Sequence, residues 1–188
     1  MNPLHLDLSA TASALLIIDV QERFLSVVPT IAADQPCGRN CRILLQAAGL
    51  LAIPRLISEQ YPAGLGPTLP HLVEAAPDVP RLGKLHFSCT EDPALAAAID
   101  RLGRQQMVLA GIEAHVCVLT TAADLVARGY QVVLAGDAIA SRDPAHVPMA
   151  IAAARDLGVL VLPTETIALR WQRQAGVGCF KAIAQLIR

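Results

Sequence analysis

The feature that most constrains this chain is a series of short apolar segments separated by segments with helical patterns. Residues 14–18 and 159–162 are the clearest apolar runs, and neither approaches the ~20 residues that a membrane helix needs. Continuous apolar strands of this length are typical of a parallel sheet covered on both faces. The alternation therefore predicts an α/β protein with a three-layer α/β/α architecture.

The pattern predicts six strands, over residues 13–20, 55–58, 82–87, 107–112, 131–135 and 159–162. Helices are expected over residues 43–52, 94–102, 116–128, 144–157, 164–170 and 180–188, with Asp92 as N-cap and Pro93 as first residue of the second. Residues 59–72, rich in glycine and proline, are expected to form a loop. Right-handed crossovers would wind these elements into a six-stranded, mostly parallel, doubly wound sheet, as a single domain over residues 1–188.

The composition narrows the classes of partner. Hydrophobic residues make up 54% and charged residues 16%, and the formal net charge is −1. Disorder and nucleic-acid binding are therefore not expected, and no membrane partner is indicated. The apolar surplus must be buried, in the sheet and also between subunits, so a homo-oligomer (a dimer or larger) is expected. An odd number of cysteines, five, and a start without a secretory signal predict reduced thiols in the cytoplasm.

In open α/β sheets, ligands bind beyond the carboxyl ends of the strands. The residues that this rule selects are Asp19, Glu59, Gln60, Lys84, the segment 113–117 and Asp137. Three of them form a chemical set. A thiol reacts as its thiolate, a lysine ammonium and a helix N-terminus favour the thiolate, and a carboxylate can hold the lysine and accept the thiol proton.

Each member of this set also has an ordinary structural interpretation. Cys117 alone would most often be a small buried hydrophobe, Lys84 a solvated surface residue and Asp19 a strand-end cap. Their common position at neighbouring strand ends favours the alternative that Cys117 is a nucleophile, with Asp19 and Lys84 as its partners.

Three motifs carry a resemblance to a known family. They are LLIIDVQ with Asp19 and Gln21, GKLHFS with Lys84, and GIEAHVCVLTTAADL with Cys117. In this order they resemble the isochorismatase-like cysteine hydrolases, which include nicotinamidases and carbamoylases, and the similarity extends to about residue 168. The resemblance implies hydrolysis of an amide-type or carbamoyl-type C–N bond in a small-molecule substrate, without a cofactor.

The resemblance also implies roles for individual residues. Asp19 would take the proton of Cys117, the sulfur would form a thioester with the substrate, and Lys84 would act on both electrostatically. The family further implies a cis peptide bond between Ile112 and Glu113. The backbone amides of Glu113 and Cys117 would then form an oxyanion hole.

The chain departs from two branches of this family. Nicotinamidases carry a metal-binding D-x-H after the second strand, whereas Glu59 and Tyr61 stand at these positions here and His71 lacks partner ligands, so no metal is expected. Isochorismatases proper typically lack a cysteine where Cys117 stands. The stretches DVQERF and SEQYPAGLGPTLPHL instead resemble the stand-alone isochorismatase-domain branch, for which a substrate is generally unassigned.

Residues that flank the motifs are candidates for the substrate pocket: Gln21, Phe24, Glu59, Tyr61, His115 and Val116. Ordinary packing is the alternative for each. Two other functions also stay open at this point. One is a thiol redox protein in which Cys89 resolves an oxidised Cys117, and the other is a non-catalytic small-molecule-binding relative.

Overall fold

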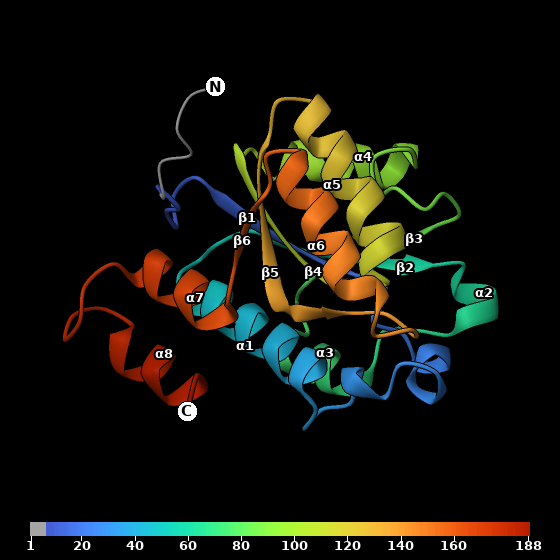
Figure 1. Cartoon of the computed structure of the whole chain (residues 1–188). Coiled ribbons are helices and arrows are strands. Elements are labelled where there is room, and N and C mark those ends of the chain that lie inside the picture. Colours follow the sequence, from blue (N-terminus) through green and yellow to red (C-terminus); the bar gives the residue numbers. More distant parts are fainter. Residues whose placement is uncertain (1–6) are drawn as a thin grey trace.

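A computed structural model describes residues 7–188 and contains one six-stranded sheet between two groups of helices (Figure 1). The strands are β1 Ser13–Ile18, β2 Arg55–Gln60, β3 Arg81–Lys84, β4 Gln106–Ile112, β5 Gln131–Ala140 and β6 Leu160–Leu162. Their order is β3-β2-β1-β4-β5-β6 and every neighbouring pair is parallel. This confirms the predicted doubly wound α/β fold, whose strand order reverses between β1 and β4.

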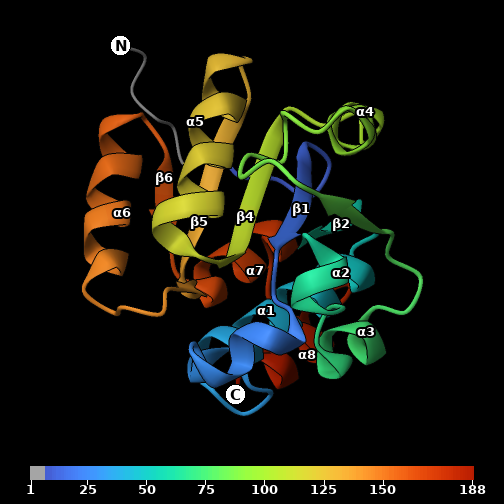
Figure 2. The same cartoon turned by 90° about the vertical axis from the view of Figure 1, so that its right-hand side faces the viewer.

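The helices divide between the two faces of the sheet (Figures 1 and 2). On one face lie α1 Pro36–Leu50, α3 Pro70–Ala75, α7 Thr164–Gln172 and α8 Phe180–Leu186, and on the other lie α4 Pro93–Arg101, α5 Leu119–Ala127 and α6 His146–Asp156. The short helix α2 Pro62–Leu65 and the 3-10 turns Glu22–Ser26 and Pro29–Ile31 belong to connections. Among residues 7–188, no helix has the length and apolar character needed to span a bilayer.

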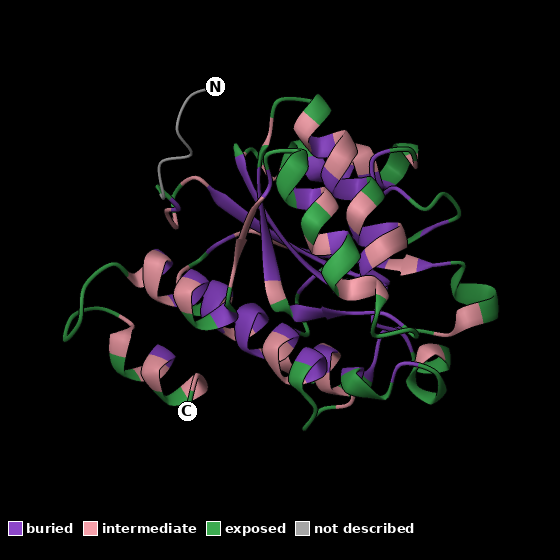
Figure 3. Cartoon of the chain, viewed as in Figure 1, coloured by how far each residue is buried: buried purple, intermediate pink, exposed green. Residues whose placement is uncertain are grey.

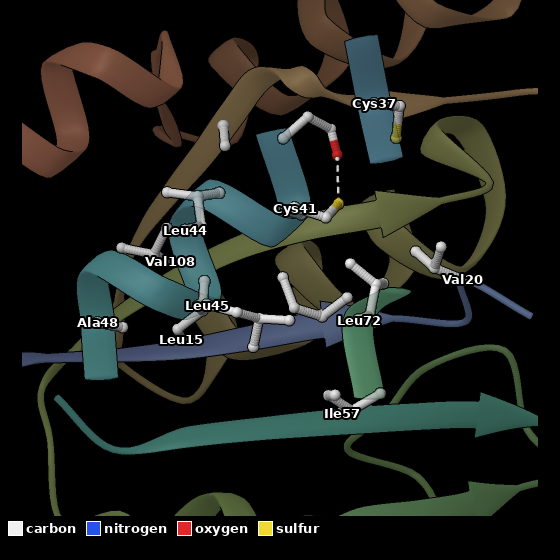
Figure 4. Packing of buried hydrophobic residues seen from close by; sticks show 14 of the residues in the cluster. Leu15, Val20, Cys37, Cys41, Leu44, Leu45, Ala48, Ile57, Leu72 and Val108 are labelled. Atoms are coloured by element: carbon white, nitrogen blue, oxygen red, sulfur yellow. Dashed lines mark hydrogen bonds between the residues drawn. The ribbon is translucent and has the colours of Figure 1, made fainter. Parts of the chain in front are cut away.

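The core explains why β1 is continuously apolar. All six of its residues are buried, as are most residues of the inner strands (Figure 3). Leu15 and Ile17 pack in the core beneath α1, where Cys41 also donates to the carbonyl of Ala138 at 3.5 Å (Figure 4). Leu16 and Ile18 pack in the opposite core, beneath α5. Alternate residues thus serve two cores, as a sheet covered on both faces requires.

The segment 59–72 is more ordered than predicted. Its first two residues extend β2, and it contains α2 and the start of α3. Pro62 and Pro70 occupy the first positions of these short helices, where a missing N–H and a fixed φ are favourable. Proline here therefore begins helical turns, whereas its presence in the sequence predicts an irregular loop.

The region after β3 also differs from expectation. The strand ends at Lys84, and residues 85–87 leave the sheet. Asp92 is the N-cap residue of α4 and Pro93 its first residue, as predicted, but the Asp92 side chain makes no hydrogen bond to the helix. Its carboxylate instead accepts a hydrogen bond from the Leu85 N–H at 2.8 Å, just after the end of β3.

Two further boundaries were wrong. Helix α1 begins at Pro36, seven residues before the predicted start at Ile43. Strand β5 continues to Ala140, so Asp137 lies within it and not after it. The Asp137 carboxylate accepts hydrogen bonds from the backbone N and Oγ1 of Thr164, both at 2.8 Å, and thereby fixes the start of α7. The remaining elements agree closely with their predicted ranges.

Candidate active site

The carboxyl ends of four adjacent strands bring the motif residues together. Sheet register places Ile18 opposite both Ser58 and Gly111, and Gln60 opposite Lys84. Asp19 follows β1 directly, so it stands beside β2 and β4 at the point where the strand order reverses. This edge is where an open α/β sheet places its ligands.

Asp19 and Lys84 form a buried ion pair. Lys84 Nζ lies 2.7 Å from Asp19 Oδ2, and the two side chains are 0% and 1% exposed. Ser58 Oγ donates to the other carboxylate oxygen, Oδ1, at 2.6 Å. Asp19 also has a positive φ of +57°, a conformation that residues other than glycine adopt at a cost of about 1–3 kcal/mol and that is concentrated at functional sites.

The environment keeps Lys84 charged. Burial is the largest single influence and lowers the pKa of this ammonium. The charge of Asp19, the nearby thiols of Cys89 and Cys117 and the hydrogen bond to Asp19 act in the opposite direction, and together they raise the net pKa. A raised pKa means that the pair persists as pH rises through the neutral range, and that its stabilising contribution is lost only when pH passes the folded-state pKa.

Cys117 lies in a π-helical turn, Ala114–Val118, immediately before α5. Its Sγ is 3.9 Å from Gln60 Oε1. Burial, followed by the charge of Asp19, raises the pKa of Cys117 to about 12, although Lys84 acts in the opposite direction. Lys84 thus favours the thiolate, but burial and the charge of Asp19 act against it more strongly.

A second thiol lies near the same ion pair. Cys89 is fully buried, and its backbone N–H donates to Thr121 Oγ1 at 3.0 Å. Burial and the charge of Asp19 raise its pKa to about 11. All five cysteines lie in the described part of the chain and all are free thiols.

The segment between β4 and Cys117 begins with a cis peptide bond between Ile112 and Glu113, at the position that the family resemblance implies. The Glu113 carboxylate accepts from the backbone N–H of Arg142 at 3.2 Å and lies 3.4 Å from its Nε. His115 Nδ1 lies 3.0 Å from Ser141 Oγ, and its ring centroid is 4.3 Å from that of His146. The side chains of Glu113 and of the predicted pocket residue His115 are thus both engaged with the chain after β5.

Other predicted pocket residues hold the segment after β2 in place. The Gln21 side chain accepts from the Gln60 backbone N–H at 2.7 Å and donates to the carbonyls of Gln60 and Gly66. Glu59 Oε1 accepts from the backbone N and Oγ1 of Thr68 at 2.8 and 2.7 Å. These contacts make both side chains structural supports of the segment.

The remaining three candidates differ in exposure. Phe24 packs partly buried against the core beneath α1, and Val116 packs against the opposite core. Tyr61 is 53% exposed. Within residues 7–188, no group of three or more His, Cys, Asp or Glu side chains is arranged to hold a metal ion.

Ser58 and Gln60 are site residues to which the sequence analysis gave no role. Gln60 was placed at the correct edge of the sheet, but Ser58 was treated only as part of a strand. Both are polar residues in a largely buried strand, and Asp19 directly follows the neighbouring strand β1. Their polar side chains could have indicated a role in the site, since a buried polar side chain needs a hydrogen-bond partner.

The fold and the site define an α/β protein with a thiol beside a buried carboxylate–ammonium pair at the switch point of its sheet. The isochorismatase domain family matches residues 13–166. Isochorismatase domain-containing protein 2 of Danio rerio is 37% identical over 96% of this chain and 89% of its own length. The chain therefore belongs to the isochorismatase family of hydrolases, and the predicted resemblance is confirmed.

Solved structures agree with this assignment. The MAR1 ribonuclease of Caenorhabditis elegans is 35% identical, with a TM-score of 0.85 over 95% of this chain and 91% of that one. The Escherichia coli YcaC gene product, described as an octameric hydrolase of unknown specificity, is 23% identical, with a TM-score of 0.84 over 93% of this chain and 85% of that one. The second similarity shows the fold alone.

Proposed function

We propose that this protein is a cysteine hydrolase that cleaves an amide-type or carbamoyl-type C–N bond of a small molecule. The observation that carries the proposal is the buried Asp19–Lys84 pair beside Cys117. A carboxylate, an ammonium and a thiol at one strand edge supply a base, a fixed positive charge and a nucleophile. A purely structural ion pair would not need a thiol at its side.

The raised pKa of Cys117 constrains the order of events. The thiol must lose its proton as it attacks, so Asp19 acts as general base while sulfur bonds to the substrate carbonyl carbon. Asp19 then gives this proton to the departing nitrogen as the C–N bond breaks, and a thioester remains on Cys117. Water, deprotonated by Asp19, attacks the thioester and releases the acid and the thiol. Lys84 keeps its charge throughout and stabilises the anionic forms of both partners.

The tetrahedral intermediates carry a negative oxygen that requires donors. We assign this role to the backbone amides of Glu113, which precedes the turn between β4 and α5, and of Cys117, which lies within it. Donors of this kind typically contribute about 10²–10³ in rate. This part of the mechanism needs no cofactor and no metal.

A screen of small amides, ureas and carbamoyl compounds tests the proposal. We expect at least one class to be hydrolysed, with the activity lost in Cys117→Ala because no other group can form the thioester. Cys89→Ala is the matched control, since it removes a buried thiol from the same region and should keep most of the activity. Hydrolysis that persists in Cys117→Ala contradicts the covalent mechanism.

Two further assays separate the alternatives. RNA should be included because the Caenorhabditis elegans relative is named a ribonuclease. With a net charge of −1, we expect no cleavage of RNA. RNA cleavage that disappears in Cys117→Ala would change the proposed substrate class from small amides to RNA.

Mild oxidation tests the redox alternative. A Cys89–Cys117 disulfide that forms under these conditions, in a protein that hydrolyses no amide, would favour a redox function.

We also propose that the protein is a homo-oligomer. Leu85, Phe87 and Met149 are large apolar side chains that are 70%, 59% and 67% exposed. Contacts between subunits would remove such apolar side chains from water. The octameric state described for the Escherichia coli relative supports this proposal.

A further inference from the structure

Lys84 makes a second close contact, with a residue that the proposed mechanism does not use. Its Nζ donates to Gln60 Oε1 at 2.6 Å, slightly closer than to Asp19, and to the carbonyl of Phe87 at 3.1 Å. A lysine ammonium has three N–H donors. The carbonyl of His86 also lies 3.3 Å away, so Gln60 is one of four acceptors around this buried charge, and its contact is the shortest.

The Gln60 amide can present only one face to Lys84. Its Nε2 donates to the carbonyl of Leu85 at 2.8 Å, so Oε1 must point toward the ammonium. A flipped amide would place N–H against N–H and oxygen against oxygen. Gln21 holds the backbone of Gln60 on both sides, with contacts of 2.7 and 3.0 Å. The acceptor is thus rigid before any substrate arrives.

The same oxygen also reaches the nucleophile. Cys117 Sγ lies 3.9 Å from Gln60 Oε1, within range of a hydrogen bond from a thiol. The Gln60 amide oxygen therefore contacts both the Lys84 ammonium and the Cys117 thiol. The thiol must become a thiolate to react, and the ammonium stabilises that thiolate. No contact with substrate is needed for this role.

The chemistry of an amide suits this position better than its alternatives. A carboxylate would add a second negative charge beside the thiol, which would disfavour the thiolate. An apolar side chain would remove the shortest hydrogen bond of a buried ammonium. We propose that Gln60 is a positioning residue that holds Lys84 Nζ and the Cys117 thiol in a fixed relation. This inference rests on the proposed role of Cys117 as nucleophile.

Other charged and titratable groups surround the thiol and belong in any account of its titration. Asp19 and Lys84 act on it directly. Glu113, four residues before it, is paired with Arg142. His115, two residues before it, contacts Ser141. The variants below leave all of these side chains unchanged.

Alkylation of Cys117 by iodoacetamide, followed by peptide mass mapping, measures thiol reactivity without any substrate. In Gln60→Glu, we expect the pH profile of alkylation to move up by about one unit, so that the rate at about pH 8 falls about tenfold. The added negative charge beside the thiol is the reason. Gln35→Glu is the matched control, because it makes the same change at an exposed position and should leave the profile in place.

Two neutral variants test positioning by itself. Gln60→Met removes the acceptor and Gln60→Asn moves it, and both should lower kcat by about tenfold or more with KM nearly unchanged, since the acceptor is not a substrate contact. Circular dichroism establishes that each variant is folded. If Gln60→Glu does not fold, the two neutral variants still decide the matter.

The outcomes separate this inference from the proposed function. An unchanged alkylation profile in Gln60→Glu, or an unchanged kcat in Gln60→Met, overturns the role of Gln60 even when Cys117→Ala is inactive. Hydrolysis that survives in Cys117→Ala overturns the proposed function, whatever the Gln60 variants do.

Discussion

At the scale of single residues, the site depends on how a buried ion pair is satisfied. Two charges removed from water are tolerated only when further hydrogen bonds complete their coordination. Ser58 donates a hydrogen bond to the Asp19 carboxylate, and Gln60 accepts one from the Lys84 ammonium. These two polar residues of β2 therefore contribute to the stability of the buried ion pair, as the two charges do.

Ser58 provides a direct test of this account. Ser58→Ala removes the hydrogen bond to Asp19 Oδ1 and should lower the free energy of unfolding by about 2 kcal/mol, the usual value for a bond to a charged group. Urea unfolding, monitored by circular dichroism, measures this change in the free energy of unfolding. Ser26→Ala, at an exposed serine, should change stability by less than about 0.5 kcal/mol. Equal effects of the two variants would show that the Asp19 carboxylate does not need Ser58.

The sequence predicted Asp19, Lys84 and Cys117 because each stands where an apolar strand stops or a helix begins. The role of Gln60 depends on the register of β2 against β3 and on which face of its amide points inward. Neither can be inferred from residue type. The raised pKa of Cys117 could not be predicted from the sequence either. The direction of this pKa shift depends on whether burial and the charge of Asp19 outweigh the charge of Lys84.

At the scale of elements, the close packing of β1 against β4 determines where the site forms. Gly111 in β4 has a φ of +117°, and a Cβ at this position would overlap the backbone of Ile18, including its carbonyl oxygen. Glycine therefore allows β4 to lie against β1 just before Asp19. The strand pattern alone predicted β4 well, yet it gave no sign of this constraint.

Gly111→Ala should accordingly be strongly destabilising. We expect a loss of about 3 kcal/mol or more in the free energy of unfolding, from the positive φ together with the overlap. Gly129→Ala is the matched control, because Gly129 has a φ of +87° and open space around it, so only the backbone cost of about 1 kcal/mol applies. Thermal unfolding compares the two, and a Gly111 variant no less stable than the Gly129 variant contradicts the packing argument.

The elements that sequence analysis misjudged are those set by tertiary contacts. The segment after β2 is ordered by Gln21 and Glu59, whose side chains bond to its backbone from a distance in sequence. β5 extends beyond its predicted end through pairing with β4. Local propensity contains no information about either contact.

At the scale of the whole molecule, a small protein with many apolar residues must bury some of them against another surface. Leu85, Phe87 and Met149 are the most exposed large apolar side chains in the described chain. We expect light scattering coupled to size-exclusion chromatography to give a mass of at least twice the 19.9 kDa of one chain. A monomer mass at every concentration would contradict the expected homo-oligomer.

The wide spacing of the site residues along the chain has a consequence for folding. Asp19 and Lys84 are 65 positions apart, and Gln60 and Cys117 are 57 apart. Such contacts form only after long segments of chain have closed, so the environment of Cys117 is complete only when β1 to β4 have assembled. In the unfolded chain this thiol has an ordinary pKa near ~8.5 and is open to alkylation. We therefore expect iodoacetamide to modify Cys117 more slowly in the native protein than in the unfolded chain, so that alkylation during refolding reports when the sheet is complete.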